Sequence, residues 1–347
     1  MVGVKLWAIA MPAKSHHYCW RTNVYVDRYY RCHRIWFRGF LFLWLGMGLL
    51  PVASVWSAEE KSSVTVFYPN IGEPYRAVFT QIIQGIEQAA NTTKIAININ
   101  ATSEELRNAA QNQPNRSVIA LGRQGLFASV ALAPDTSLVV GGVVGVKGLM
   151  SNDIHAMQVF SLMPEPLLLF MQLKKLMPRC QRIMVVYDPD KSAWLLQQAE
   201  LAAKQMQIEL HAIAVSNLKD AVTTYQTLFR SASATDDALW LPQDVTTVED
   251  SIVLPLVLRE AWTRQLLVFS STVSHVHLGA LFALYPDNTA YGRRLAKAAA
   301  RNAATAGIKI ELLNDVLTAF NSNTAQHLNL VLNAEQRQQF DLIFPER

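Results

Sequence analysis

Polar side chains that could hold a small solute follow the ends of short apolar segments. Ile183–Tyr187 is an apolar, partly β-branched run typical of a buried strand, and Asp188 comes directly after it. Pro189 favours a turn there, and Ser192 is placed to cap the helix that follows. Open α/β sheets bind ligands beyond the carboxyl ends of their strands. These residues are therefore candidates for hydrogen bonds and ion pairs with a small molecule.

The same reasoning nominates residues after the other predicted strands. In the C-terminal half the candidates are Asp188, Ser192, Trp194, Gln243, Asp244, Ser271 and Asp287. In the N-terminal half they are Tyr68, Asn70, Thr102, Ser103 and Arg123. For most of them a plainer structural role stays open.

Several of these candidates have a structural alternative to the ligand-binding role. Arg123 could hold a carboxylate in bidentate fashion, or form a surface salt bridge. The pair Thr102–Ser103 could offer backbone N–H groups to an anion, or simply cap a helix. Asp244 and Asp287 could receive an ammonium group, or form turns and caps. Trp194 could stack on a planar ligand, or pack in the core.

No spacing in the sequence nominates a catalytic or metal site. There is no G-x-S-x-G or H-E-x-x-H motif, and the glycine-rich stretch 141–148 lacks the ending of a phosphate loop. His275 and His277 have no third ligand nearby. We therefore expect no enzyme, no metal and no cofactor. An exported hydrolase stays open as a further class, and it would need a nucleophile and a base that converge in the cleft.

Strand-like and helix-like segments alternate through residues 64–146 and again from residue 165. This rhythm predicts an α/β fold made of two Rossmann-like lobes with parallel sheets. Punctuating residues in 147–164 mark the passage between the lobes. We predict a leader at 1–58, a first lobe at 59–155 and 308–347, and a second lobe at 156–307. The tail is expected to return to the first sheet.

The leader has the pattern of an export signal. Basic residues precede an uninterrupted apolar region, Phe40–Leu50 (residues 40–50), and small residues follow it up to Ser57. Cleavage after Ser57 would release the protein into the periplasm, and an uncleaved membrane anchor is the alternative. After the leader, Cys180 is the one remaining cysteine, so no internal disulfide can form there.

The charge distribution argues against a nucleic-acid partner. The 347 residues carry a net charge of +4. The first 58 residues hold seven Lys or Arg and one acid, so the remainder is slightly acidic. Apolar residues make up 51% and charged residues 17%, which is enough for large cores.

Several stretches resemble the substrate-binding proteins of ABC transporters with the type I periplasmic binding fold, particularly the branch with tryptophan- and tyrosine-binding members. They are SLMPEPLLLFMQLKKLMPRCQRIMVVYDPDKSAW, LWLPQDVTT, LGALFALYPDNTAYGRRLAKAAA and LNLVLNAEQ, within residues 160–340. The first lobe fits by pattern only. After LLVFSS the family commonly has acidic residues, whereas this chain has Ser271, Thr272 and Val273.

The resemblance implies two hinged lobes that close on a small ligand, such as an amino acid or a planar metabolite. The partner would be an ABC permease in the inner membrane, and the protein would act as a monomer. The alternative is a periplasmic sensing module for a membrane receptor or kinase.

Overall fold

The computed structural model describes residues 61–133, 135–145, 156–301 and 307–345. The predicted signal peptide and cleavage position lie outside these ranges. Within them, no helix is both long enough and apolar enough to cross a membrane. Strands and helices alternate over most of the described chain, as an α/β fold requires.

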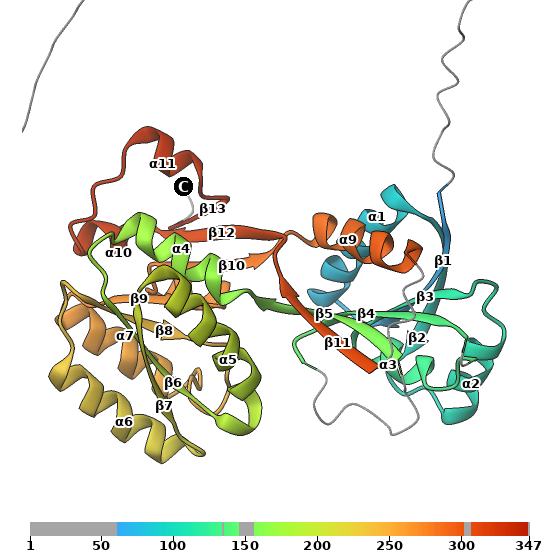
Figure 1. Cartoon of the computed structure of the whole chain (residues 1–347), viewed down its shortest axis with the longest axis horizontal. Coiled ribbons are helices and arrows are strands. Elements are labelled where there is room, and N and C mark those ends of the chain that lie inside the picture. Colours follow the sequence, from blue (N-terminus) through green and yellow to red (C-terminus); the bar gives the residue numbers. More distant parts are fainter. Residues whose placement is uncertain (1–60, 134, 146–155, 302–306, 346–347) are drawn as a thin grey trace, which may run out of the picture. The chain divides into compact units, whose positions relative to one another are not determined.

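The first sheet has parallel strands in the order β11-β5-β4-β3-β1-β2. These strands are β1 (Ser63–Asn70), β2 (Asn91–Asn98), β3 (Ser117–Leu121), β4 (Ser137–Val143), β5 (Ala156–Pro164) and β11 (Gly307–Leu313). The helices that pack on it are α1 (Tyr75–Ala89), α2 (Ser103–Gln111), α3 (Gly122–Ser129) and α9 (Asn288–Ala300). Figure 1 shows these elements together.

Alternate side chains of the first sheet enter opposite cores. Val64 and Val66 of β1 pack with α1 and α9, whereas Phe67 packs with α3 on the other face. In β3, Ile119 and Val118 divide in the same way. This period of two explains why these strands are apolar throughout and why helices cover both faces.

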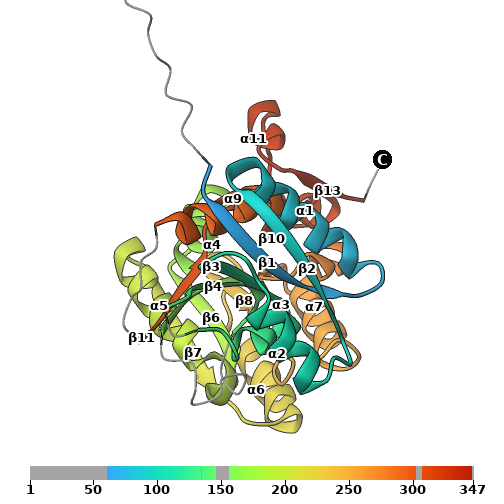
Figure 2. The same cartoon turned by 90° about the vertical axis from the view of Figure 1, so that its right-hand side faces the viewer.

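Helix α9 packs on α1, although it follows a strand of the second sheet, and both Figure 1 and Figure 2 show the two helices side by side. Two glycines permit this close approach. A Cβ on Gly292 would collide with the carbonyl group of Ile82, and a Cβ on Gly85 with the carbonyl group of Thr289. A larger residue at either position would force the helices apart.

The second sheet has the order β13-β12-β10-β9-β8-β6-β7, with β12 antiparallel to β10 and the other neighbours parallel. Its strands are β6 (Arg182–Tyr187), β7 (Glu209–Ala214), β8 (Asp237–Leu241), β9 (Leu267–Ser270), β10 (Phe282–Pro286), β12 (Val316–Asn321) and β13 (Leu342–Phe344). Its helices are α4 (Pro166–Leu176), α5 (Pro189–Met206), α6 (Leu218–Ser231), α7 (Val253–Thr263), α8 (Val273–Leu278), α10 (Ser322–His327) and α11 (Ala334–Gln338).

A stack of aromatic rings holds the centre of the second sheet. Trp240 of β8 lies parallel to Phe269 of β9 with ring centroids 6.5 Å apart, and Phe269 lies parallel to Phe282 of β10 at 5.2 Å. The edge of Phe170 from α4 meets the Trp240 ring with the centroids 5.7 Å apart. These buried rings fix the three strands, so the loops beyond their carboxyl ends start from a rigid base.

The chain passes between the two sheets at three places: from β5 to α4, from β10 to α9, and from β11 to β12. Backbone hydrogen bonds tie these crossing segments together. Glu165 N donates to Leu313 O (3.0 Å), and Asp287 N donates to Asp315 O (2.9 Å). Several short crossings are the architecture that a hinge requires.

The sheet order corrects the predicted assignment of segments to lobes. The tail completes the first sheet only through β11, because β12 and β13 pair within the second sheet. There Phe320 of β12 stacks on Phe340 with the ring centroids 4.1 Å apart. Conversely, β5 and α9 belong to the first sheet rather than to a second lobe at 156–307. An apolar pattern predicts that a strand is buried but does not specify which of two cores receives it.

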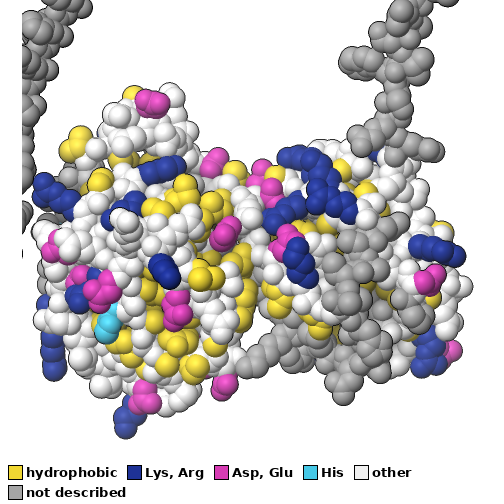
Figure 3. All heavy atoms as spheres, viewed as in Figure 1, with side chains coloured by type: hydrophobic (Ala, Val, Ile, Leu, Met, Phe, Trp, Pro, Cys, Tyr) yellow, Lys and Arg dark blue, Asp and Glu magenta, His cyan; other side chains and the backbone are white. Residues whose placement is uncertain are grey.

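Basic and acidic side chains are interspersed over the face of the molecule drawn in Figure 3. This distribution agrees with the balanced charge of the sequence after the leader.

Candidate functional site

Asp244 joins two strand ends of the second sheet. Its Oδ2 accepts hydrogen bonds from Asp188 N (2.8 Å) and Ser192 Oγ (3.0 Å). Its Oδ1 accepts from Thr246 N (2.9 Å) and Thr247 N (3.4 Å). The residue is only 3% exposed. Protein donors therefore occupy this carboxylate, which matches the turn-forming alternative better than contact with a solute ammonium.

Hydrogen bonds within the protein also occupy the carboxylate of Asp188. It caps α5 through a hydrogen bond from Asp190 N (3.0 Å), and it accepts another from Thr246 Oγ1 (2.8 Å). Burial alone would raise the pKa of Asp188, but these bonds and nearby Lys191 outweigh burial and lower the pKa below its ordinary value.

Lys191 is the charged group that this strand end presents to solvent. Its Nζ lies 3.5 Å from Asp188 Oδ2 and also contacts the Thr246 hydroxyl. The side chain is 48% exposed. An ammonium has three N–H donors, so one stays available to a solute. The sequence alone does not single out this lysine, because a charged residue in a first helical turn resembles an ordinary solvated one.

Ser271 lies beyond β9 and has one hydrogen-bonding function left. Its Oγ accepts from Trp240 Nε1 (3.2 Å), and no described residue accepts its hydroxyl proton. The preceding Ser270 Oγ lies 2.8 Å from Nδ1 of the buried His275. Burial lowers the pKa of His275, although Asp250, 3.8 Å from its Nε2, opposes the shift. The neutral imidazole therefore helps to shape this strand end.

At the first sheet, Thr102 and Ser103 begin α2. Thr102 forms a complete capping box with Glu105, whose N donates to Thr102 Oγ1 (3.2 Å) while Glu105 Oε2 accepts from Thr102 N (2.7 Å). The hydrogen bond from this backbone N–H lowers the pKa of Glu105. The capping alternative therefore describes Thr102, whereas Ser103 is exposed with no side-chain bond in the described chain.

Arg123 differs from these candidates because no carboxylate of the described chain pairs with its guanidinium. It lies in the first turn of α3, whose N-cap residue, Leu121, supplies no side-chain hydrogen bond. Its guanidinium lies over the Phe127 ring, 5.1 Å from the centroid. Among the described residues, no carboxylate pairs with it. Within the described chain, the start of α3 therefore combines backbone N–H groups that no side chain caps with a cation that no carboxylate pairs, as an anionic group requires.

The remaining candidates make fewer side-chain hydrogen bonds within the described chain. Tyr68 is half-buried and packs against the core, and Asn70 donates from Nδ2 to Asn98 Oδ1 (3.2 Å). Gln243 is exposed. Asp287 caps α9 through a hydrogen bond from Ala290 N to its Oδ1 (2.9 Å).

Trp194 lies apart from the other candidates, in a cavity of about 360 Å³ that we call the crossing pocket. The pocket is lined by Glu165, Trp194, Gln197, Gln198, Arg294, Ile310, Glu311, Leu312 and Asn314. No other candidate lines it. Its walls come from α5 of the second sheet, from α9 and β11 of the first, and from two crossing segments.

Arg294 contacts two carboxylates and one aromatic ring at the crossing pocket. Its Nη2 lies 3.0 Å from Glu311 Oε2, and its Nη1 lies 3.6 Å from Asp315 Oδ2. Its guanidinium also lies over the Phe160 ring at 5.0 Å. Burial alone would raise the pKa of Glu311, but hydrogen bonds from Lys309 and its other partners outweigh burial and lower the pKa. A single sequence does not reveal this network of contacts, because its residues lie on segments far apart in the chain.

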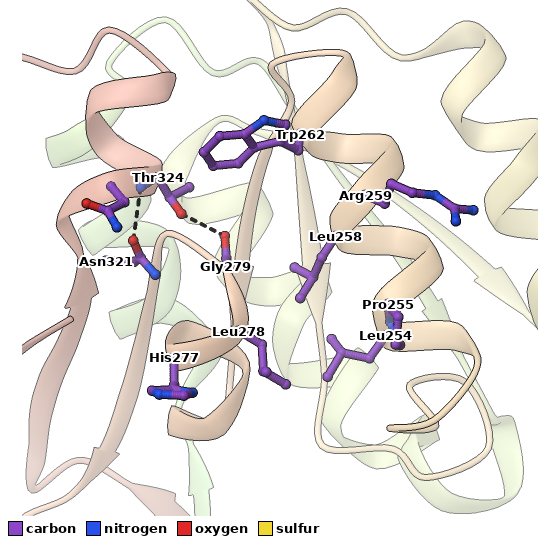
Figure 4. A pocket seen from close by; sticks show the side chains of 11 residues that line it. Leu254, Pro255, Leu258, Arg259, Trp262, His277, Leu278, Gly279, Asn321 and Thr324 are labelled. Atoms are coloured by element: carbon purple, nitrogen blue, oxygen red, sulfur yellow. Dashed lines mark hydrogen bonds between the residues drawn. The ribbon is translucent and has the colours of Figure 1, made fainter. Parts of the chain in front are cut away.

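A larger cavity of about 520 Å³ lies between α7, α8 and α10. Figure 4 shows Leu254 and Leu258 on one side, Leu278 on the other, and Arg259 pointing away. Two of its polar residues, Asn321 and Thr324, are hydrogen-bonded within the protein: Thr324 N donates to Asn321 Oδ1 (2.9 Å) and Thr324 Oγ1 donates to Gly279 O (3.0 Å). None of the candidates lines this cavity. Within the described ranges, no cluster of His, Cys, Asp and Glu could hold a metal ion.

Two mostly parallel α/β sheets joined by three crossings define the type I periplasmic binding fold. A ligand-free, open structure of a substrate-binding protein with adhesive properties from Clostridium difficile is similar to this chain, with a TM-score of 0.60 at 13% identity. That similarity covers 82% of this chain and all of the other. At this identity the similarity establishes the fold alone.

The ABC transporter substrate-binding protein family matches residues 168–347, just over half of the chain. The chain belongs to this family, which captures small ligands and is of a non-catalytic type. An ABC domain in complex with L-Trp from Streptococcus pneumonia has 14% identity, a TM-score of 0.49, and coverage of 82% of this chain and all of that one. The comparison with curated proteins found no match.

Proposed function

We propose that this protein is an exported solute-binding protein that delivers a small molecule to an ABC permease. Membership of the substrate-binding family is the observation that carries this proposal. The leader would direct export, and the permease in the inner membrane would be the protein partner. The solute would bind where the strand ends of the two sheets face a common space, and the crossing segments would act as the hinge.

The chemistry of the strand ends favours a solute with an anionic group. Arg123 and the uncapped start of α3 offer charge and backbone N–H donors at the first sheet. At the second sheet, Lys191 and Ser271 each keep a donor. An amino acid or another small carboxylic acid, which presents a planar carboxylate, fits the fork of an arginine.

A thermal-shift screen of the purified protein against amino acids and small carboxylic acids tests the binding function. A solute at 100 times its dissociation constant should stabilise the folded state by about 2.7 kcal/mol. An unfolding midpoint that no solute raises would contradict the proposed function.

Two arginines at opposite ends of β3 give a matched test of the site. Arg123→Gln should weaken binding of the solute found in the screen by about tenfold or more, because a charge-assisted hydrogen bond is lost. Arg116 precedes β3, and among the described residues it forms only an exposed ion pair with Asp135 (3.7 Å), so Arg116→Gln serves as the control. Equal affinity in both variants would remove Arg123 from the site.

A further inference from the structure

The crossing pocket contains one carboxylate that the fold leaves without a counter-charge. Glu165 follows β5 at the N-cap position of α4, yet its side chain makes no capping hydrogen bond. Among the described residues no Lys, Arg or His pairs with it. Its neighbour is the amide of Asn314, which donates to Glu165 Oε2 (2.6 Å) and Leu313 O (3.2 Å) when its nitrogen faces these acceptors. Glu165 thus carries an unneutralised negative charge into the cavity.

The other charges of the crossing pocket are balanced. Glu311 Oε1 lies 2.8 Å from Lys309 Nζ, and Glu311 Oε2 lies 3.0 Å from Arg294 Nη2. Arg294 is also near Asp315 Oδ2 (3.6 Å). Arg294 therefore pairs with Glu311 and Asp315, and in the described chain it forms no ion pair with Glu165.

Trp194 supplies an aromatic wall to the same cavity. It is half-buried, and its inner part packs against the core of the second sheet. An indole face attracts cations more strongly than any other side-chain ring. An aromatic wall together with an unpaired carboxylate is the combination that recognises an organic ammonium group. Ile310 and Leu312 add apolar lining, and the exposed amides Gln197 and Gln198 also line the pocket.

We propose that the crossing pocket binds a small organic cation, with the ammonium group at Glu165 and a flat apolar part against Trp194. This site is separate from the strand-end site, since Trp194 is the one strand-end candidate that lines the pocket and Arg123 and the others do not. Its walls belong to elements of both sheets, so a bound cation contacts both sides of the hinge.

A charge series of three probes of one shape tests the proposal by isothermal titration calorimetry on the purified protein. The probes are 2-phenylethylammonium, neutral 2-phenylethanol and anionic 3-phenylpropanoate. We expect the ammonium probe to bind about tenfold more tightly than the alcohol, since it alone gains a charge-assisted hydrogen bond. Equal affinities, or no binding of any probe, would overturn the proposal.

Substitutions of the two pocket residues test where the ammonium probe binds. Glu165→Gln should remove the preference for the ammonium probe, and Trp194→Phe should weaken its binding while retaining an aromatic face. Glu200→Gln makes the same charge change at an exposed position of α5 outside the pocket and should leave the affinity unchanged.

The experiment separates this site from the proposed solute site. Arg123→Gln should leave binding of the ammonium probe intact. If Glu165→Gln fails to fold, the Trp194→Phe variant still decides the question. An ammonium preference that survives both pocket variants contradicts the inference, whatever the solute screen shows.

Discussion

At the scale of single residues, the strand ends divide into side chains that hold the fold and side chains that remain available. Asp244, Asp188 and Thr102 belong to the first group because backbone N–H groups occupy their oxygens. Arg123 belongs to the second group, because its guanidinium pairs with no carboxylate in the described chain and contacts only the Phe127 ring. This division follows from hydrogen-bond satisfaction and not from residue type.

Replacing Asp244 tests its structural role. Asp244→Ala should lower the free energy of unfolding by about 3 kcal/mol, because four donors lose a buried acceptor. Urea denaturation measures the change. The neighbouring exposed Gln243→Ala is the control and should change stability by less than about 0.5 kcal/mol. An Asp244→Ala protein of normal stability that has lost solute binding would instead make Asp244 a ligand contact.

The sequence predicts which residues lie at the strand ends but does not show which of them are occupied. Ser192 and Asp244 are 52 positions apart, and Asp188 and Asp244 are 56 apart, yet they share hydrogen bonds. A single sequence does not reveal such partners. The capping role of Thr102 is predictable from the sequence, since its capping box with Glu105 is a local pattern.

At the scale of elements, local periodicity predicts where the strands and helices lie. It does not predict which elements pair with each other. The run Ile183–Tyr187 lies within β6, and the Asp188 turn leads into α5 as expected. Helix α9 was expected with the second lobe, but its contact with α1 depends on two small residues 207 positions apart, Gly85 and Gly292. Neither glycine indicates its partner in the sequence.

The glycine contact between α1 and α9 gives a prediction at this scale. Gly292→Ala should destabilise the protein by about 2–3 kcal/mol, because the added methyl group meets the backbone of Ile82 and the helices must separate. Thermal or urea unfolding measures this loss. Gly72→Ala is the control, since a Cβ at Gly72 has open space around it. Equal stabilities of the two variants would contradict the close packing of the helices.

At the scale of the whole molecule, the two sheets and their three crossings relate the structure to solute capture. Each sheet has its own cores, and short hydrogen-bonded segments connect them. The two-lobed class was predictable from the restart of the α/β rhythm at residue 165. The assignment of the tail was not, because β12 and β13 are as apolar as strands of either sheet.

Solute-dependent closure is the central claim, and small-angle X-ray scattering tests it most directly. We would titrate the purified protein with the tightest-binding solute from the screen and measure the radius of gyration, with the Arg123→Gln variant at the same solute concentration as the control. A solute held between two hinged lobes should reduce the radius of gyration of the wild-type protein as binding saturates. An unchanged radius of gyration at full occupancy would contradict capture by closure.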